Sequence, residues 1–255
     1  MNQAADETLT PPGLAEEPEI ACGPSVRGGP LRRGVREGVS AARANLRPAA
    51  ALWAVGLAIL GAYYHTDWGR AGLERVASVR EAYGLVYAML ATAVFGGVIP
   101  WLVMKSRRVT RQRATLGLLA FMSAVWMEKG IEVSLLYDGL AWLVGDTNDL
   151  GVIAAKVALD QGLYAPLYAA PTLLLLYRWH DAGYRFEAFK AALSKRWWLD
   201  RALPVIMANS AVWTPTVVMI YALPLALQLP MQNLVLCFWS LILMFMADPA
   251  KESGA

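Results

Sequence analysis

Apolar residues form long blocks along most of this chain, separated by short polar connections. Five blocks follow one another at 48–64, 83–104, 115–144, 150–177 and 201–247. A helix needs roughly 20 residues to cross about 30 Å of hydrocarbon, and the last block is about twice that length. Pro224 and Pro230 lie inside it, and proline interrupts helical hydrogen bonding. We therefore divide it into 201–223 and 229–247. The pattern predicts an all-α integral membrane protein, a polytopic bundle of about six transmembrane helices; an undivided last block would leave five.

The charges of the connections agree with six spans. Connection 105–114 carries five basic residues and no acidic one, whereas GDTND between the third and fourth blocks is acidic. The stretches 27–47 and 178–200 are also rich in arginine and lysine, while 65–82 is mixed. Basic connections thus alternate with non-basic ones, as the positive-inside rule requires of six spans with both termini in the cytoplasm. Five spans would put the C-terminus outside.

One connection has a helical pattern of its own, at about 184–199. Its apolar residues recur at helical spacing: Phe186, Phe189, Leu193 and Trp197. Its basic residues fall elsewhere on the helical wheel: Arg185, Lys190, Lys195 and Arg196. This pattern predicts an amphipathic helix on the cytoplasmic membrane surface, with Trp197 and Trp198 at headgroup level and anionic lipid as a partner. A solvated loop is the alternative.

The composition supports a membrane protein and narrows its partners. Hydrophobic residues make up 57% of the chain and charged residues 17%, a more apolar balance than soluble domains have. Ten Trp and ten Tyr suit bilayer interfaces, so lipid is the expected partner. A net charge of +3 without a basic run interleaved with aromatics does not indicate nucleic-acid binding. The two cysteines and two histidines show no metal-ligand spacing, so no metal or cofactor is expected.

The two ends of the chain differ from the apolar middle. Residues 1–46 are rich in Pro, Gly, Ala and charge, and this composition predicts a disordered cytoplasmic tail. A membrane domain at 47–247 and a short polar tail at 248–255 follow. The tail opens with acidic residues and has no early apolar stretch, so it predicts neither a transit peptide nor a signal peptide. We expect the bacterial cytoplasmic (inner) membrane, with an organellar membrane as the alternative.

A lysine and an aspartate lie in the middle of the fourth block, where no other residue from Leu150 to Tyr177 is charged. At helical spacing they form one polar stripe: Lys156, Asp160, Tyr164 and Tyr168, with Gln161 beside it. Small residues and a proline form a ridge on the opposite side: Ala154, Ala158, Gly162, Pro166 and Ala170. A charge facing lipid would cost roughly 3 kcal/mol at the bilayer centre. We therefore expect the stripe to face the bundle interior and the ridge to pack against a neighbouring helix.

The third block supplies charged partners for this stripe: Glu128, Lys129, Glu132 and Asp138. An antiparallel hairpin that turns near Thr147 would set Asp138 level with Lys156. We predict a buried cluster in which Lys156 pairs with Asp160 and Asp138, and Lys129 pairs with a glutamate. One interpretation is a satisfied polar network that fixes the register of the helices. The other is the lining of a water-filled path for small solutes or ions.

The motif Lys156-x-x-x-Asp160-Gln161-Gly162-x-Tyr164-Ala165-Pro166 resembles the Asp-Gln-x-x-x-Ala-Pro motif of the peroxisomal membrane protein / mitochondrial Mpv-seventeen family. The resemblance covers roughly 83–247, and further family positions fall in order at Gly130, Tyr137, Leu140, Leu223-Pro224 and Trp239-Ser240. Gln228 stands where the family has an arginine and Ile131 where it has a proline, as in a divergent relative. The resemblance implies a small integral membrane protein that forms or regulates a non-selective channel for small molecules.

Three functional hypotheses follow. The first is a channel or pore-like protein for small solutes or ions, with the polar cluster lining its path. The second is a membrane organiser that transports nothing and binds lipid or protein partners; both are compatible with a homo-oligomer. The third is an intramembrane enzyme, which we do not favour because the sequence contains no His-Glu-x-x-His, Gly-x-Ser-x-Gly or cofactor-loop motif. We expect kinks at Pro166 and Pro224 to help shape the bundle.

Overall fold

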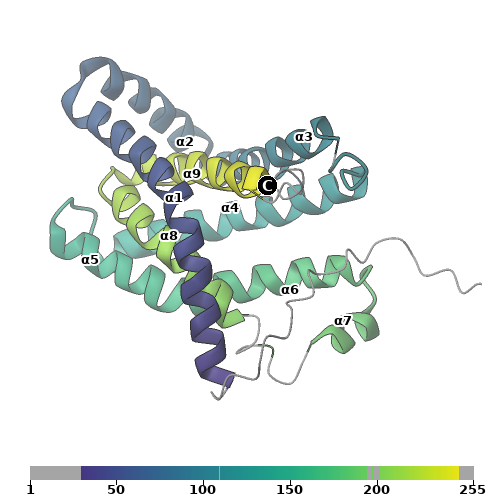
Figure 1. The fold of residues 1–255 in the computed structure, drawn as a ribbon. Coiled ribbons are helices and arrows are strands. Elements are labelled where there is room, and N and C mark those ends of the chain that lie inside the picture. The colour runs from purple at the N-terminus through teal and green to yellow at the C-terminus, as the bar shows by residue number, and fades with distance from the viewer. Residues whose placement is uncertain (1–29, 109, 194–196, 198–201, 247–255) are drawn as a thin grey trace, which may run out of the picture.

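The computed structural model describes residues 30–108, 110–193, 197 and 202–246, and this part of the chain contains helices and no strand (Figure 1). In chain order the elements are α1 (Pro30–His65), α2 (Asp67–Ala93), the π-helical η1 (Val94–Val98), α3 (Ile99–Ser106), α4 (Leu116–Val144), α5 (Leu150–Leu159), the π-helical η2 (Asp160–Ala169), α6 (Ala170–Asp181), α7 (Phe186–Ala192), α8 (Leu203–Tyr221) and α9 (Leu225–Met246). The elements α2, η1 and α3 follow one another without a break, as do α5, η2 and α6. The expected all-helical fold class is confirmed.

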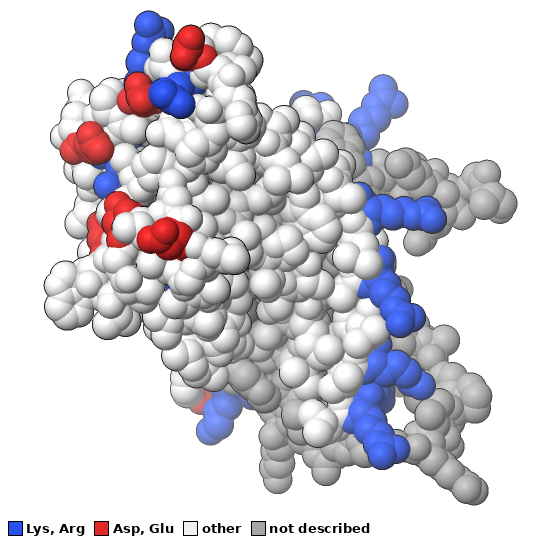
Figure 2. Space-filling view, turned by 90° about the vertical axis from the view of Figure 1, so that its left-hand side faces the viewer, with Lys and Arg blue, Asp and Glu red and all other residues white. Residues whose placement is uncertain are grey.

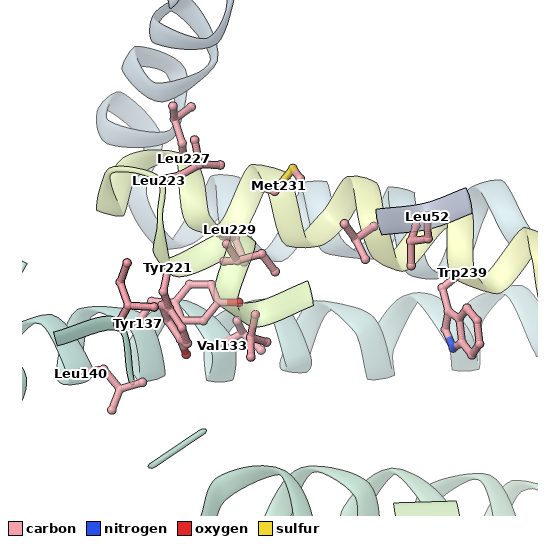
Figure 3. Close-up of a cluster of buried hydrophobic side chains, with 14 of the residues drawn as sticks. Leu52, Val133, Tyr137, Leu140, Tyr221, Leu223, Leu227, Leu229, Met231 and Trp239 are labelled. Atoms are coloured by element: carbon pink, nitrogen blue, oxygen red, sulfur yellow. The ribbon is translucent and has the colours of Figure 1, made fainter. Parts of the chain in front are cut away.

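The helix α9 lies in the middle of the bundle, in contact with α1, α2, η1, α3, α4 and α8. Around it, α1 packs along α8 and α2 packs along α4. Large apolar side chains from several helices fill the space between them, among them Tyr137 of α4, Tyr221 of α8 and Leu229 of α9 (Figure 3). Leu52 brings α1 into the same core. One continuous core therefore holds helices from both ends of the chain.

The turns between helices meet at two ends of the molecule. At one end, the Tyr64 hydroxyl donates a hydrogen bond to the carbonyl of Ala222 at 2.6 Å and accepts one from Asn148 at 2.7 Å. This residue thus joins the α1–α2, α4–α5 and α8–α9 turns. At the other end, Phe121 in the first turns of α4 stacks against Tyr177 of α6 and against Tyr184, which follows α6. The α1–α2, α4–α5 and α8–α9 turns therefore lie together at one end of the bundle.

Within the described residues, four helical stretches are long and apolar enough to cross a membrane: Leu31–His65, Asp67–Ser106, Leu203–Tyr221 and Leu225–Ile242. The protein is thus a helical bundle whose apolar helices are compatible with contact to a lipid bilayer. The expected spans 115–144 and 150–177 are helical but are not among the four. These are the two segments that carry the charged residues of the predicted cluster, which lower their hydropathy.

Two segments that were expected outside the spans are helical. Residues 30–46 of the expected tail belong to α1, where Gly34 and Gly38 are buried, whereas residues 1–29 lie outside the described residues. A Cβ at Gly38 would lie 2.8 Å from the sulfur of Met207 in α8. Residues 67–82, expected as a connection, form the first half of α2, and Thr66 caps this helix by accepting a hydrogen bond from the Gly69 N–H at 3.1 Å.

The prolines of the last block act differently from one another. The expected break at Pro224 is confirmed, since α8 ends at Tyr221 and α9 begins at Leu225. Pro230, in contrast, lies inside α9, and the LALQL segment is helical. A proline inside an apolar bundle is tolerated where neighbouring groups satisfy the carbonyl it frees. The span expected to begin at 229 therefore begins at Leu225.

The expected surface helix at 184–199 lies only partly within the described residues. The helix α7 covers Phe186–Ala192, and Leu193 after it is extended, with φ −91° and ψ 109°. Lys190 lies exposed in its last turn. Lys195, Arg196 and Trp198 lie outside the described residues, so their expected place on the membrane surface stays a prediction, as does that of Trp197.

The backbones of α2 and α4 approach each other closely at Gly130. A Cβ added there would overlap the carbonyl oxygen of Ala88 and lie 2.9 Å from the Thr92 hydroxyl oxygen. Gly139, further along α4, is exposed, and a Cβ there would meet nothing within 4 Å. The same helix thus offers one glycine that packing requires and one that it does not.

We expect Gly130→Ala to destabilise the bundle by about 1–3 kcal/mol, because the backbones of α2 and α4 must separate to admit the methyl group. Gly139→Ala should leave stability unchanged or raise it slightly, since alanine favours helix. Thermal unfolding of both variants in dodecyl maltoside, followed by circular dichroism, measures the difference. Equal melting temperatures for the two variants would contradict the close approach.

Candidate functional site

The helix that carries Lys156 and Asp160 changes its winding between them. It is α-helical to Leu159 and π-helical from Asp160 to Ala169, and the backbone N–H of Asp160 donates to the carbonyls of both Lys156 and Val157. Pro166 lies inside the π-helical part and has no N–H to donate. Wider turns of this kind are frequent at functional sites in proteins. The local structure therefore places the polar stripe at an irregular part of the bundle.

Asp160 is buried, with 4% of its surface exposed. Its carboxylate accepts a hydrogen bond from the Tyr221 hydroxyl of α8 at 2.6 Å and one from the Gln161 amide at 3.0 Å. The ring of Tyr221 in turn meets that of Tyr137 edge-on, with centroids 5.4 Å apart. Among the described residues, no lysine, arginine or histidine nitrogen lies within the 4.0 Å of an ion pair to Asp160. Two hydrogen bonds therefore hold this carboxylate without a neighbouring cation.

Lys156 turns away from Asp160, so the predicted Lys156–Asp160 pair is wrong. Its Nζ lies 3.5 Å from the carboxylate of Asp146, in the turn before α5, and 5.9 Å from the centre of the Tyr221 ring. Helical side chains tilt toward the N-terminus, and a lysine that precedes an acid by four residues is the weaker orientation for a pair. The long Lys156 side chain therefore reaches back to the turn and is 1% exposed.

Asp138 also differs from the prediction, because its partner is on another helix. Its carboxylate accepts a hydrogen bond from the guanidinium of Arg80 in α2 at 3.0 Å, and nearly half of its side chain is exposed. The expected pair between Asp138 and Lys156 is therefore wrong. Arg80 was not predicted as a partner, because residues 65–82 were expected to form a connection outside the bundle.

The predicted pairing of Lys129 with a glutamate is confirmed. The Lys129 ammonium forms an ion pair with the mostly buried carboxylate of Glu132, and a second one at 3.4 Å with Glu128, whose side chain is half exposed. It also donates a hydrogen bond to the Thr172 hydroxyl of α6 at 3.1 Å. The Tyr164 hydroxyl of η2 donates a hydrogen bond to the carboxylate of Glu132. This second polar cluster joins α4 to η2 and α6.

A cavity of about 380 Å³ lies between α4, η2, α6, α8 and α9. Of the predicted cluster, Lys129, Asp160 and Gln161 line it, whereas Glu128, Glu132, Asp138 and Lys156 do not. Its wall contains further polar residues that were not predicted: Thr92, Tyr137, Asn209, Gln232 and Ser240. Aromatic and aliphatic side chains form the rest, including Trp126, Tyr177, Trp213 and Trp239. The arrangement suits a small molecule that is mostly apolar and has a few polar groups.

Polar side chains of α9 complete the polar contacts of this core. Tyr137 donates a hydrogen bond to the Gln232 side chain, and Thr92 donates one at 2.9 Å to the buried side chain of Asn233. Gln228, which stands at the arginine position of the resembled family, is buried and donates to the Leu223 carbonyl at 3.1 Å. The three amides at 228, 232 and 233 interrupt an otherwise apolar block, which was a usable signal for a polar interior.

The small-residue ridge is not packed against a neighbouring helix, contrary to the prediction. Ala154, Ala158 and Gly162 are exposed, and a Cβ at Gly162 would meet nothing within 4 Å. Pro166, further along the ridge, is partly buried. The reason is the close packing of the opposite side of this helix, where the polar stripe turns inward.

No group of three or more His, Cys, Asp or Glu that could hold a metal occurs in the described part of the chain.

We expect Glu132→Gln to destabilise the protein by up to about 3 kcal/mol, because it leaves the buried Lys129 ammonium with only the half-exposed Glu128. Glu128→Gln is the matched control and should cost less than about 1 kcal/mol, since its pair is open to solvent. Thermal unfolding at pH 7 in dodecyl maltoside compares them. A larger loss for Glu128→Gln than for Glu132→Gln would contradict the assignment of the main pair.

No protein-family model, curated protein or solved structure matches this chain. The family resemblance of the Asp160-Gln161 motif therefore stays a prediction.

Proposed function

We propose that this protein is a membrane channel or pore-like protein for small solutes or ions, whose path passes through the cavity lined by Asp160, Gln161 and Lys129. The observation that carries the proposal is this cavity itself, which places buried polar groups of η2 and α4 around open space in the middle of apolar helices. Ionisable residues inside membrane segments are costly, and in membrane proteins they mark solute and ion pathways. A merely structural network would have no need of an open cavity beside it.

The proposed topology has six spans, with α4 and the stretch Leu150–Asp181 added to the four apolar helices. Two features of the described helices support it. α4 has 29 residues, and Leu150–Asp181 continues without a break through α5, η2 and α6. At a rise of about 1.5 Å per residue, 29 residues extend some 40 Å, enough to cross a bilayer. Inside a bundle their charges would face partners and the cavity, away from lipid.

Both termini are proposed to lie in the cytoplasm. Asp146 and Asp149 lie in the α4–α5 turn that Asn148 ties to Tyr64, whereas arginines occupy the α3–α4 connection at the other end. Figure 2 shows acidic side chains gathered on one side of a face and a row of basic side chains along the opposite edge. The positive-inside rule assigns the basic end to the cytoplasm. A bacterial cytoplasmic membrane is the proposed location.

A π-helical wall suits a path of this kind. Backbone carbonyls in η2 lack the regular α-helical partners, and irregular backbone at membrane depth is tolerated where it is buried in protein or lines a water-filled cavity. Asp160, at the start of η2, keeps acceptor capacity beyond its two hydrogen bonds. A solute in the cavity would thus meet acceptors on one wall and aromatic rings on others.

We expect Asp160→Asn to change the single-channel conductance or the cation-to-anion permeability ratio by at least about twofold, because it removes a charge from the wall of the path. Asp138→Asn is the control, since Asp138 pairs with Arg80 and does not line the cavity. Currents from both purified variants and the wild type in planar bilayers test this. Unaltered currents in a folded Asp160→Asn protein would remove Asp160 from the path.

A second candidate is a membrane organiser that transports nothing and binds partners. The exposed ridge of Ala154, Ala158 and Gly162 favours it, because small residues at this spacing allow close helix association in lipid. Lys190 and the basic residues beyond α7 would add contact with anionic lipid.

The ridge is tested by cysteine cross-linking in a chain whose own cysteines are replaced by serine. If a second copy occupies the ridge, Ala158→Cys should form a disulfide-linked dimer in liposomes upon mild oxidation, and Gly139→Cys on α4 should not. Silent bilayers together with a specific Ala158→Cys dimer would favour the organiser. Equal cross-linking at both positions would contradict a specific contact at the ridge.

A further inference from the structure

We propose that the cavity binds a small organic ammonium ion, with the Asp160 carboxylate as its counter-charge. This names the class of solute for the proposed path, and its transport consequence rests on that proposed function. The binding itself can be measured without transport. The inference depends on the charges, the wall and the size of the cavity.

The other buried charges of the site already have partners within the protein. Lys129 pairs with Glu132 and Lys156 pairs with Asp146, so neither pair includes Asp160. Of the carboxylates around the cavity, Asp160 is the one held by hydrogen bonds alone within the described residues. A buried carboxylate without a cation is costly, and a bound cation would offset that cost.

The hydrogen bonds of Asp160 leave room for such a ligand. An ionised carboxylate has about four acceptor positions, and Tyr221 and Gln161 take two of them, one on each oxygen. Both partners are neutral hydrogen-bond donors, so they leave a charge on Asp160 uncompensated. Lys129, the cation that does line the cavity, is occupied by its two glutamates and Thr172.

The remaining wall suits the organic part of the ligand. Aromatic rings approach the cavity from α4, η2, α6, α8 and α9: Trp126, Tyr137, Tyr164, Tyr177, Trp213 and Trp239. Aromatic faces attract ammonium groups, and cages of such rings are a common way to bind quaternary ammonium ions. The wall is mostly apolar, which suits an organic cation better than an inorganic cation that takes six to eight oxygen ligands. A volume of about 380 Å³ accommodates a small organic molecule.

The probe is choline, compared with 3,3-dimethylbutan-1-ol, which has the same shape without the positive charge. Binding to the full chain in dodecyl maltoside, which contains no ammonium group, is followed by isothermal titration calorimetry. We expect saturable binding of choline by the wild type and at least tenfold weaker binding of the neutral alcohol. Asp160→Asn should weaken choline binding at least tenfold, and Asp138→Asn should not.

Absence of choline binding by the folded wild type would overturn the inference, and so would equal affinity for choline and the neutral alcohol. The ligand comparison needs only the wild type, so it decides the question even where Asp160→Asn fails to fold. Choline binding together with silent planar bilayers would leave the binding site standing and remove the proposed channel. Conductance without choline binding would leave the proposed channel standing and remove the binding site.

Discussion

The cost of holding charges among apolar helices governs the centre of this protein. Lys129, Lys156 and Asp160 are all buried, and each contacts at least one side chain from another helix or from a turn: Thr172 of α6, Asp146 of the α4–α5 turn and Tyr221 of α8. Those contacts fix how α4, η2 and α8 lie relative to one another, because a shift of either partner would expose an uncompensated group. The apolar core can tolerate rearrangement more easily than this set of polar contacts can.

Helix packing provides the close contacts that the polar core needs. Gly130 brings α2 against α4, and Gly38 brings α1 against α8. On the opposite side of the bundle, the π-helical turns of η2 and the proline inside them widen the helix near Asp160. Close approach on one side and wide turns on the other leave the cavity between α4, η2, α8 and α9. The site thus arises from backbone geometry as well as from its side chains.

The proposed function depends on a charge imbalance that remains after the buried groups have paired. Lys156 pairs with Asp146 in the α4–α5 turn, and Lys129 pairs with Glu132 on its own helix α4. Neither lysine therefore compensates the charge of Asp160. Asp160 is left with the hydroxyl of Tyr221 and the amide of Gln161, facing a space with aromatic walls. A polar group in that position is retained at a cost in stability, which is the usual mark of a residue with a role beyond folding.

The sequence by itself determined the helical fold, the helix within 115–144, the break at Pro224 and the burial of Lys156 and Asp160. These follow from local properties: hydropathy, helical period and the missing N–H of proline. Only the tertiary structure decided which charges pair. Helical spacing placed Lys156 beside Asp160, yet the lysine reaches back to Asp146, and Asp138 binds an arginine from a segment expected to be a connection. It also decided that the ridge at Ala158 and Gly162 faces outward. Side-chain direction and the approach of distant helices set these contacts, and neither can be read from spacing along one chain segment.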